Sequence, residues 1–79
     1  MLILYTKTGC PWCVEALSFL REKKVSFEER EVRSNPVFFA ELKQKSGQER
    51  TPTVDLDGAI LADTDAPAIE QFLKEKGVL

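Results

Sequence analysis

The chain has 79 residues, enough for one small domain with a single modest hydrophobic core, and we predict one domain over residues 1–79. Its formal net charge of −2 and its lack of a basic stripe argue against nucleic-acid binding. The absence of histidine excludes Cys–His and Ser–His catalysis and mixed Cys/His zinc sites, and no apolar run is long enough to span a membrane or to serve as a signal peptide.

The first half of the chain predicts a strand, a helix and a second strand. Residues 2–5 form an apolar run typical of a central strand that is buried on both faces. Residues 11–23 repeat apolar side chains at helical spacing, and residues 25–32 alternate loosely between apolar and charged side chains. We therefore expect a helix over 11–23 and a short, partly exposed strand within 25–32, joined as a parallel, right-handed β-α-β unit.

The second half predicts a helix, a hairpin and a last helix. Asn35-Pro36 has the pattern of a helix cap followed by proline at the first helical position, and we expect that helix to reach about Ser46 and to stop at Gly47. Residues 53–56 and 59–61 flank Asp-Gly, a pair typical of a type I′ hairpin turn. Thr64 or Asp65 caps the last helix, which ends at Gly77.

The two helices after the first cover the remaining apolar surface in different ways. In the middle helix, Phe38 and Phe39 are neighbours, and we expect only one of them in the core of so small a domain, with the other exposed at a partner face. In the last helix, Ile69, Phe72 and Leu73 share the inward face. The element order is β-α-β-α-β-β-α.

The stretch Cys10-Pro11-Trp12-Cys13 lies where the first strand gives way to the first helix. Pro11 fits the first helical position, and a residue before proline avoids the α region, so Cys10 is expected at the N-cap. Its sulfur then faces the free N–H groups of the first turn, where the helix dipole alone lowers a thiol pKa by about one unit. We predict that Cys10 is the nucleophile.

Cys13 lies one helical turn further on, on the same face as Leu17 and Leu20. We therefore expect it to be buried, and burial raises the pKa of a thiol. One exposed acidic thiol and one sheltered partner are what thiol–disulfide exchange requires. The chain has only two cysteines, whereas a secreted domain of this size usually carries several disulfides. The pair therefore indicates a redox function in the cytoplasm.

The element order and three motifs together resemble the glutaredoxins, over nearly the whole chain. The motifs are C-P-W-C after the first strand, Thr51-Pro52 before the hairpin, and Thr64-Asp65 before the last helix. The resemblance implies an α/β, thioredoxin-like fold, in which a four-stranded mixed sheet is flanked by three helices. It also implies glutathione as the reducing co-substrate, no bound cofactor or metal, and disulfide-bearing proteins as partners of a monomer.

The resemblance implies binding roles for residues around the first cysteine. Lys7 matches the lysine that contacts a carboxylate of glutathione and favours the thiolate, although a lone turn lysine is more often simply solvated. Trp12 keeps an aromatic ring where C-P-Y-C is commonest, and its place in the first turn predicts an outward side chain that contacts substrate or partner. Arg50 and Gln48 occupy a loop that sometimes adds a contact to the glycine carboxylate of glutathione.

Four further residues match family positions in the second half of the chain. Thr51 matches the residue whose backbone pairs with the substrate like an added strand, and Pro52 matches the cis-proline after it. Thr64 and Asp65 match the pair that holds the γ-glutamyl end of glutathione, through a backbone N–H and a carboxylate respectively. Helix capping also explains Thr64-Asp65, and the two roles are compatible.

One departure from the family pattern bears on the substrate. Glutaredoxins usually carry Gly-Gly before this pair, whereas this chain has Ala62-Asp63, which adds bulk and negative charge near the expected glutathione carboxylate. Three functions therefore stay open. The first is a glutathione-linked disulfide oxidoreductase, and the second is a redoxin that receives electrons from thioredoxin reductase and passes them to a protein such as ribonucleotide reductase. The third is a metal or iron–sulfur carrier that dimerises through Cys10.

Overall fold

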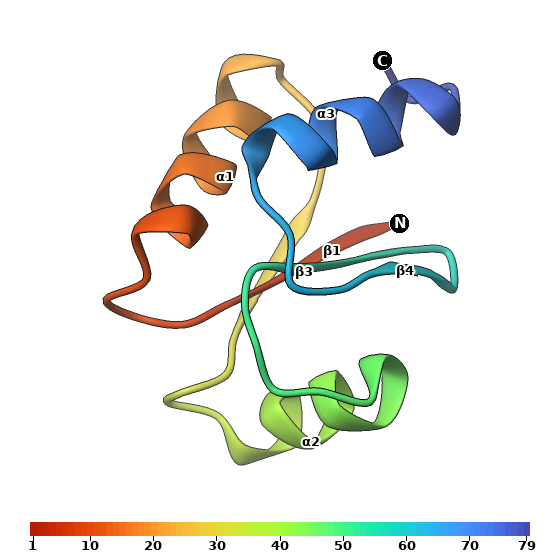
Figure 1. The fold of residues 1–79 in the computed structure, drawn as a ribbon. Helices are drawn as coiled ribbons and strands as arrows, with labels where there is room; N and C mark the ends of the chain where they lie inside the picture. The colour runs from red at the N-terminus through yellow and green to blue at the C-terminus, as the bar shows by residue number, and fades with distance from the viewer.

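A computed structural model describes all residues from 1 to 79, and it contains the seven elements in the expected order (Figure 1). Six of them lie within about one residue of their expected bounds, whereas the second strand is shorter than the stretch 25–32 in which it was expected. The elements are β1 (Leu2–Thr6), α1 (Pro11–Glu22), β2 (Glu28–Glu31), α2 (Pro36–Ser46), β3 (Thr53–Leu56), β4 (Ala59–Leu61) and α3 (Ala66–Glu75).

The four strands form one mixed sheet in the order β2-β1-β3-β4. The central strand β1 pairs in parallel with β2 and antiparallel with β3, so that Leu4 lies between Glu29 and Val54. The parallel pairing of β1 and β2 confirms the expected arrangement. All four residues of β2 are charged, which suits an edge strand because charged side chains discourage pairing with another chain.

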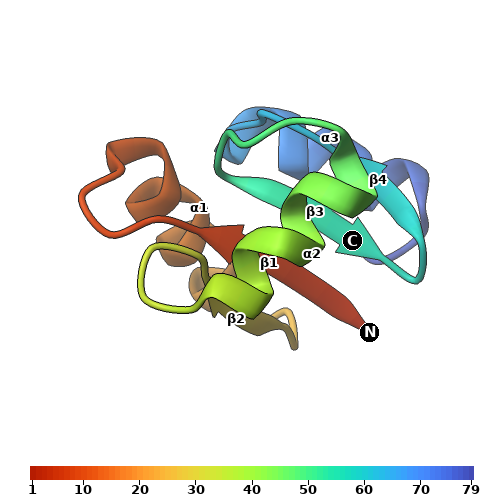
Figure 2. The ribbon, with the colours of Figure 1, turned by 90° about the horizontal axis from the view of Figure 1, so that it is seen from below.

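The helices divide between the two faces of the sheet. Helices α1 and α3 lie together on one face, and α2 lies alone on the other (Figure 1). Seen from the α2 side, this helix crosses in front of the strands (Figure 2). No helix of the structure has both the length and the apolar character that a membrane span requires.

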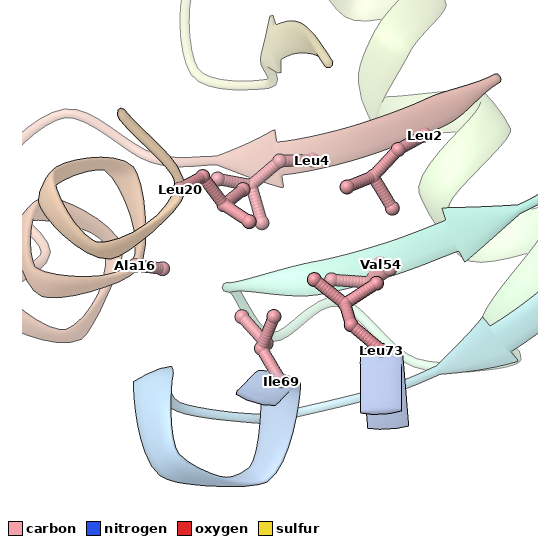
Figure 3. Packing of buried hydrophobic residues seen from close by; sticks show 7 residues of the cluster. All are labelled: Leu2, Leu4, Ala16, Leu20, Val54, Ile69 and Leu73. Carbon is pink, nitrogen blue, oxygen red and sulfur yellow. The ribbon is translucent and has the colours of Figure 1, made fainter. Parts of the chain in front are cut away.

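The larger part of the core lies between the sheet, α1 and α3. Side chains of β1, β3 and the two helices point toward one another there (Figure 3). The seven buried residues of this cluster are Leu2, Leu4, Ala16, Leu20, Val54, Ile69 and Leu73. Because each of them comes from an inward position of its element, this cluster fixes α1, and with it the cysteine motif, against β1.

The smaller part of the core lies under α2 and consists of Tyr5, Val32 and Leu42. Phe38 and Phe39 are both half-buried and both pack against it, so the expectation that one of them is exposed is wrong. Each ring also lies under a cation, with Arg30 5.4 Å from the Phe38 ring centre and Lys43 5.2 Å from that of Phe39.

Ionic contacts supplement this smaller core. The buried Tyr5 hydroxyl donates to the Glu41 carboxylate and accepts from the Lys45 ammonium, each at 2.9 Å. Lys45 also contacts Asp55 at 2.8 Å, and Arg30 contacts Glu41. Burial opposes ionisation of Asp55, but the hydrogen bonds from Lys45 and the Gly58 N–H, together with the charges of Lys45 and Arg30, outweigh it and lower the pKa of the carboxyl.

Candidate active site

Cys10 is the N-cap of α1, as the sequence predicts. Its backbone is extended, with φ −95° and ψ 110°, and Pro11 takes the first helical position. The Cys10 sulfur accepts a hydrogen bond from the backbone N–H of Cys13 at 3.3 Å. The turn before it is closed by a bond from the Cys10 N–H to the Lys7 carbonyl at 3.1 Å, and Gly9 adopts a φ of 87° that favours glycine.

The surroundings of Cys10 favour its thiolate. Partial burial opposes ionisation, but hydrogen bonds from the Cys13 side chain and backbone, from Thr51 and from the Trp12 backbone outweigh it and lower the pKa of Cys10. In its thiol form, Cys10 donates to the Thr51 carbonyl at 3.7 Å. The lowered pKa therefore comes from direct hydrogen bonds at the helix start and with Thr51, and the Lys7 side chain is not among the causes.

Cys13 has the opposite character. Only 2% of its surface is exposed, and both thiols are free. Burial, followed by its hydrogen bond with Cys10, raises the pKa of Cys13 to about 11. The structure thus confirms the expected asymmetry, with an acidic, accessible front sulfur and a buried partner that holds its proton.

Cys10 opens into a groove of about 520 Å³ at one edge of the sheet. Six of the residues predicted to bind glutathione line it. They are Lys7, Trp12, Arg50, Thr51, Thr64 and Asp65. Trp12 is 58% exposed, as expected for its outward position, and Pro52 is buried.

The peptide bond between Thr51 and Pro52 is cis, as the resemblance implies. The Thr51 N–H has no hydrogen-bond partner, which leaves it free to pair with an extended ligand. The Thr64 N–H, by contrast, donates to the Pro52 carbonyl at 2.9 Å. The chain already uses this donor to hold Thr64 beside Pro52, and the binding role of Thr64, which lines the groove, stays a prediction.

Asp65 takes the capping role at α3. One of its carboxylate oxygens accepts from the Ala68 N–H at 3.0 Å, and its own backbone N–H has no partner. A ligand carboxylate at this end of the groove therefore finds a free donor at Asp65, one residue later than expected.

The loop before Thr51 contains one residue that reaches the groove and one that does not. The Arg50 side chain is 79% exposed and lies 3.9 Å from the Asp63 carboxylate. Gln48 instead ties the loop together, because it donates to Ser46 and Thr53 and accepts from the Arg50 N–H. The expected ligand contact of Gln48 is wrong, since its amide is occupied within the protein.

Arg33 also lines the groove, and the sequence reasoning missed it. It lies just after β2, and β1 and β2 are parallel, so Arg33 reaches the same edge of the sheet as Lys7. The signal was available in the sequence, since consecutive strands of a β-α-β unit present their carboxyl ends together. No group of three or more His, Cys, Asp or Glu side chains is placed to hold a metal ion.

Comparison with known proteins agrees with this geometry. The family profile described as glutaredoxin matches residues 2–61. Glutaredoxin 1 of Rickettsia conorii is 37% identical over 70 residues, which cover 82% of this chain and 66% of that protein. Glutaredoxin 3 of Escherichia coli K12 is 32% identical over 62 residues, which cover 78% of this chain and 75% of that protein.

A solved structure extends the likeness to the whole fold. The crystal structure of the thioredoxin-like protein BC3987 matches with a TM-score of 0.84 and 30% identity, over 92% of this chain and 100% of that chain. The chain therefore belongs to the glutaredoxin family of thiol redox proteins, and it has a thioredoxin-like fold.

Proposed function

We propose that this protein is a glutathione-linked thiol–disulfide oxidoreductase that reduces protein disulfides and glutathione mixed disulfides. The observation that carries the proposal is the pairing of an accessible thiol of lowered pKa at a helix start with a buried thiol one turn later. We further propose that it acts in the cytoplasm, because reduced glutathione is abundant where thiols are kept reduced. We also propose that it acts as a monomer without a bound cofactor.

In the first step, the Cys10 thiolate attacks one sulfur of the substrate disulfide. A bond forms between that sulfur and Cys10, the substrate S–S bond breaks, and the departing thiolate takes a proton from water. The donors at the start of α1 that stabilised the thiolate lose their charge partner at this point. The lowered pKa of Cys10 increases its thiolate fraction, and it also makes Cys10 a better leaving group in the second step.

In the second step, Cys13 or glutathione resolves the mixed disulfide. The hydrogen bond with Cys10 and the charge of the Cys10 thiolate both raise the pKa of Cys13, and both disappear once Cys10 is part of a neutral disulfide. Cys13 then loses its proton more readily, attacks the Cys10 sulfur and releases the second substrate thiol. Two glutathione thiols reduce the resulting Cys10–Cys13 disulfide and leave as oxidised glutathione.

The groove supports glutathione as the reductant. It offers the free N–H groups of Thr51 and Asp65 and the Lys7 ammonium, and these groups suit an extended peptide with a carboxylate at each end. A reductase-coupled assay with NADPH and glutathione tests the proposal. Cys13→Ser should keep deglutathionylation and lose protein-disulfide reduction, and Cys10→Ser should lose both. If Cys13→Ser abolishes both activities, the glutathione branch is wrong.

Asp63 motivates a second candidate, a redoxin reduced by thioredoxin reductase. Its carboxylate lines the groove, where a ligand carboxylate of glutathione would meet it. Oxidised protein should be offered NADPH with thioredoxin reductase and, in parallel, glutathione with glutathione reductase. Reduction only by the first system would replace our proposal with this candidate, whereas silence with the first system removes it.

A further inference from the structure

The sheet order fixes the order in which charged side chains meet the groove. Arg33 follows β2, Lys7 follows β1, Thr51 precedes β3 and Asp63 follows β4, and all four line the groove. Since the strands run β2-β1-β3-β4 across the sheet, these residues form a row in the same sequence. Two cations therefore lie at one end of the row and an acid at the other.

The cations at the β2–β1 end are available to a ligand. Neither Lys7 nor Arg33 forms an ion pair within the protein, and together they also line an adjoining hollow with Val32 and Phe39. The acid nearest to them along the chain is Glu31, which accepts four hydrogen bonds from Thr8 and Ser34. Glu31 keeps its negative charge, because its pKa is lowered to about 2, and it offsets one of the two cations. One positive charge remains, so this end of the groove attracts an acidic group.

The acids at the β4 end are equally accessible. The Asp63 side chain is 55% exposed, and its backbone N–H is held by the Thr53 hydroxyl at 3.3 Å. Asp65 lines the same end of the groove, while Arg50, at 3.9 Å from Asp63, offsets one of the two negative charges. One negative charge remains on the side chains, so this end disfavours an acidic side chain and favours a basic one. The γ-glutamyl end of glutathione carries an ammonium beside its carboxylate, so it has no net charge and is not repelled in this way.

The reacting sulfur lies between the two ends. Cys10 contacts the Thr51 carbonyl, which belongs to the middle of the row. The row crosses three strand spacings, about 14 Å in all, which exceeds the roughly 10 Å Debye length at 0.1 M salt. Each end therefore acts mainly on the group directly above it, and a peptide across Cys10 presents a different residue to each end.

We propose that this charge order makes Arg33 and Asp63 specificity-determining residues for polypeptide substrates. The preferred substrate is a disulfide-bearing segment with an acidic residue on the side of the cysteine that lies over Lys7 and Arg33, and a neutral or basic residue on the other side. The inference rests on the proposed function only in requiring that Cys10 attacks a peptide disulfide.

Four synthetic peptides test the inference. Each carries one cysteine as a 2-pyridyl mixed disulfide, flanked by Glu before and Lys after, by Lys before and Glu after, by two Glu, or by two Lys. The Cys10 thiolate attacks the peptide sulfur, the bond to the pyridyl sulfur breaks, and thiopyridone, the better leaving group, departs with the electron pair and is protonated. Its absorbance gives the rate, and Cys13 then displaces the peptide thiol.

Of the two peptides with one Glu and one Lys, we expect one to react about tenfold faster than the other at low ionic strength, because each charge contact changes the rate roughly threefold. The peptides with two Glu or two Lys should react at rates in between. The difference should fall toward unity at about 1 M salt. Arg33→Gln and Asp63→Asn should each reduce the preference, and the double variant should abolish it. Asn is chosen because Asp63 has a φ of 50°, which Asn tolerates.

Asp57→Asn is the matched control. Asp57 also has a φ of 50°, but it lies in the β3–β4 turn beside the N-terminus, at the opposite edge of the sheet. The Asp57→Asn substitution removes the same charge as Asp63→Asn, at a residue of the same backbone conformation, and it should leave the preference for one peptide order intact. Equal rates for the two mixed orders, or a preference that survives the double variant, would overturn the inference. Failure of the glutathione proposal alone would leave these rates unchanged, because the assay contains no glutathione.

Discussion

The unequal acidity of the two thiols predicts unequal alkylation. When the reduced protein is treated with a limiting amount of iodoacetamide at pH 7, Cys10 should react far faster than Cys13. The reagent consumes only thiolate, so the ratio of rates reports the two thiolate fractions and the access to each sulfur.

The magnitude follows from the pKa values. With its pKa raised to about 11, Cys13 is a thiolate in roughly one molecule in ten thousand at pH 7. The pKa of Cys10 is lowered from its usual range near 9, which makes its thiolate fraction at least about a hundredfold larger. The 2% exposure of Cys13 slows its reaction further.

Peptide mapping by mass spectrometry at successive times gives both rates in one sample. The same reaction in denaturant is the internal control, because both thiols are then exposed and the rates should approach each other. Comparable rates in the folded protein would refute the division of roles between a front nucleophile and a buried resolving thiol. A large ratio that persists in denaturant would show that the fold is not its cause.

Three further results are expected. Folding raises the pKa of Cys13, so the stability of the reduced protein should fall as pH rises from about 8.5 toward 11, and urea titrations of Cys13→Ser should not show that loss. Backbone hydrogen bonds from Ser34 and Thr8 lower the pKa of Glu31 to about 2, so the stability that Glu31 contributes is present above about pH 4.3 and is lost toward pH 2. Glu31→Gln should flatten that part of the curve of unfolding free energy against pH. A curve that the substitution leaves unchanged would show that these hydrogen bonds do not stabilise the fold. Leu20→Ala should cost about 2–5 kcal/mol in chemical denaturation, since Leu20 is fully buried between α1 and the sheet.

The features that the sequence predicted well depend on neighbours along the chain. Cys10-Pro11 and Asn35-Pro36 both start helices, because proline fixes the first helical position and the residue before it accepts from the first turn. Asp57 and Gly58 have φ values of 50° and 95°, as a type I′ turn requires. Part of the acidity of Cys10 followed from the same local logic, because Trp12 and Cys13 lie in the first turn of α1, whereas the Thr51 contact comes from a distant segment.

The features that escaped prediction depend on contacts between different segments of the chain. Arg33 reaches the groove only because β2 pairs in parallel with β1, and the Thr64 N–H is occupied only because Pro52 lies beside it. Phe38 and Phe39 both find cover because Tyr5 and Leu42 form a second, small core under α2. Among these contacts, only those with Tyr5 lie beyond helical or hairpin reach in the sequence. Leu42 is within about one turn of both rings, and Pro52 and Thr64 flank the predicted hairpin. The place of Arg33 follows from the predicted parallel β-α-β unit.

The attachment of α2 has a consequence for how solution conditions act on the protein. Three buried residues and a set of ionic contacts hold this helix, whereas seven buried residues hold the opposite layer. We expect α2 to detach before α1 and α3 when acid or salt weakens the ionic contacts. The segment after α2 carries Thr51, whose carbonyl contacts the Cys10 sulfur. Acidity and ionic strength thus have an indirect path to the reactive thiol, through the anchoring of a helix that never touches it.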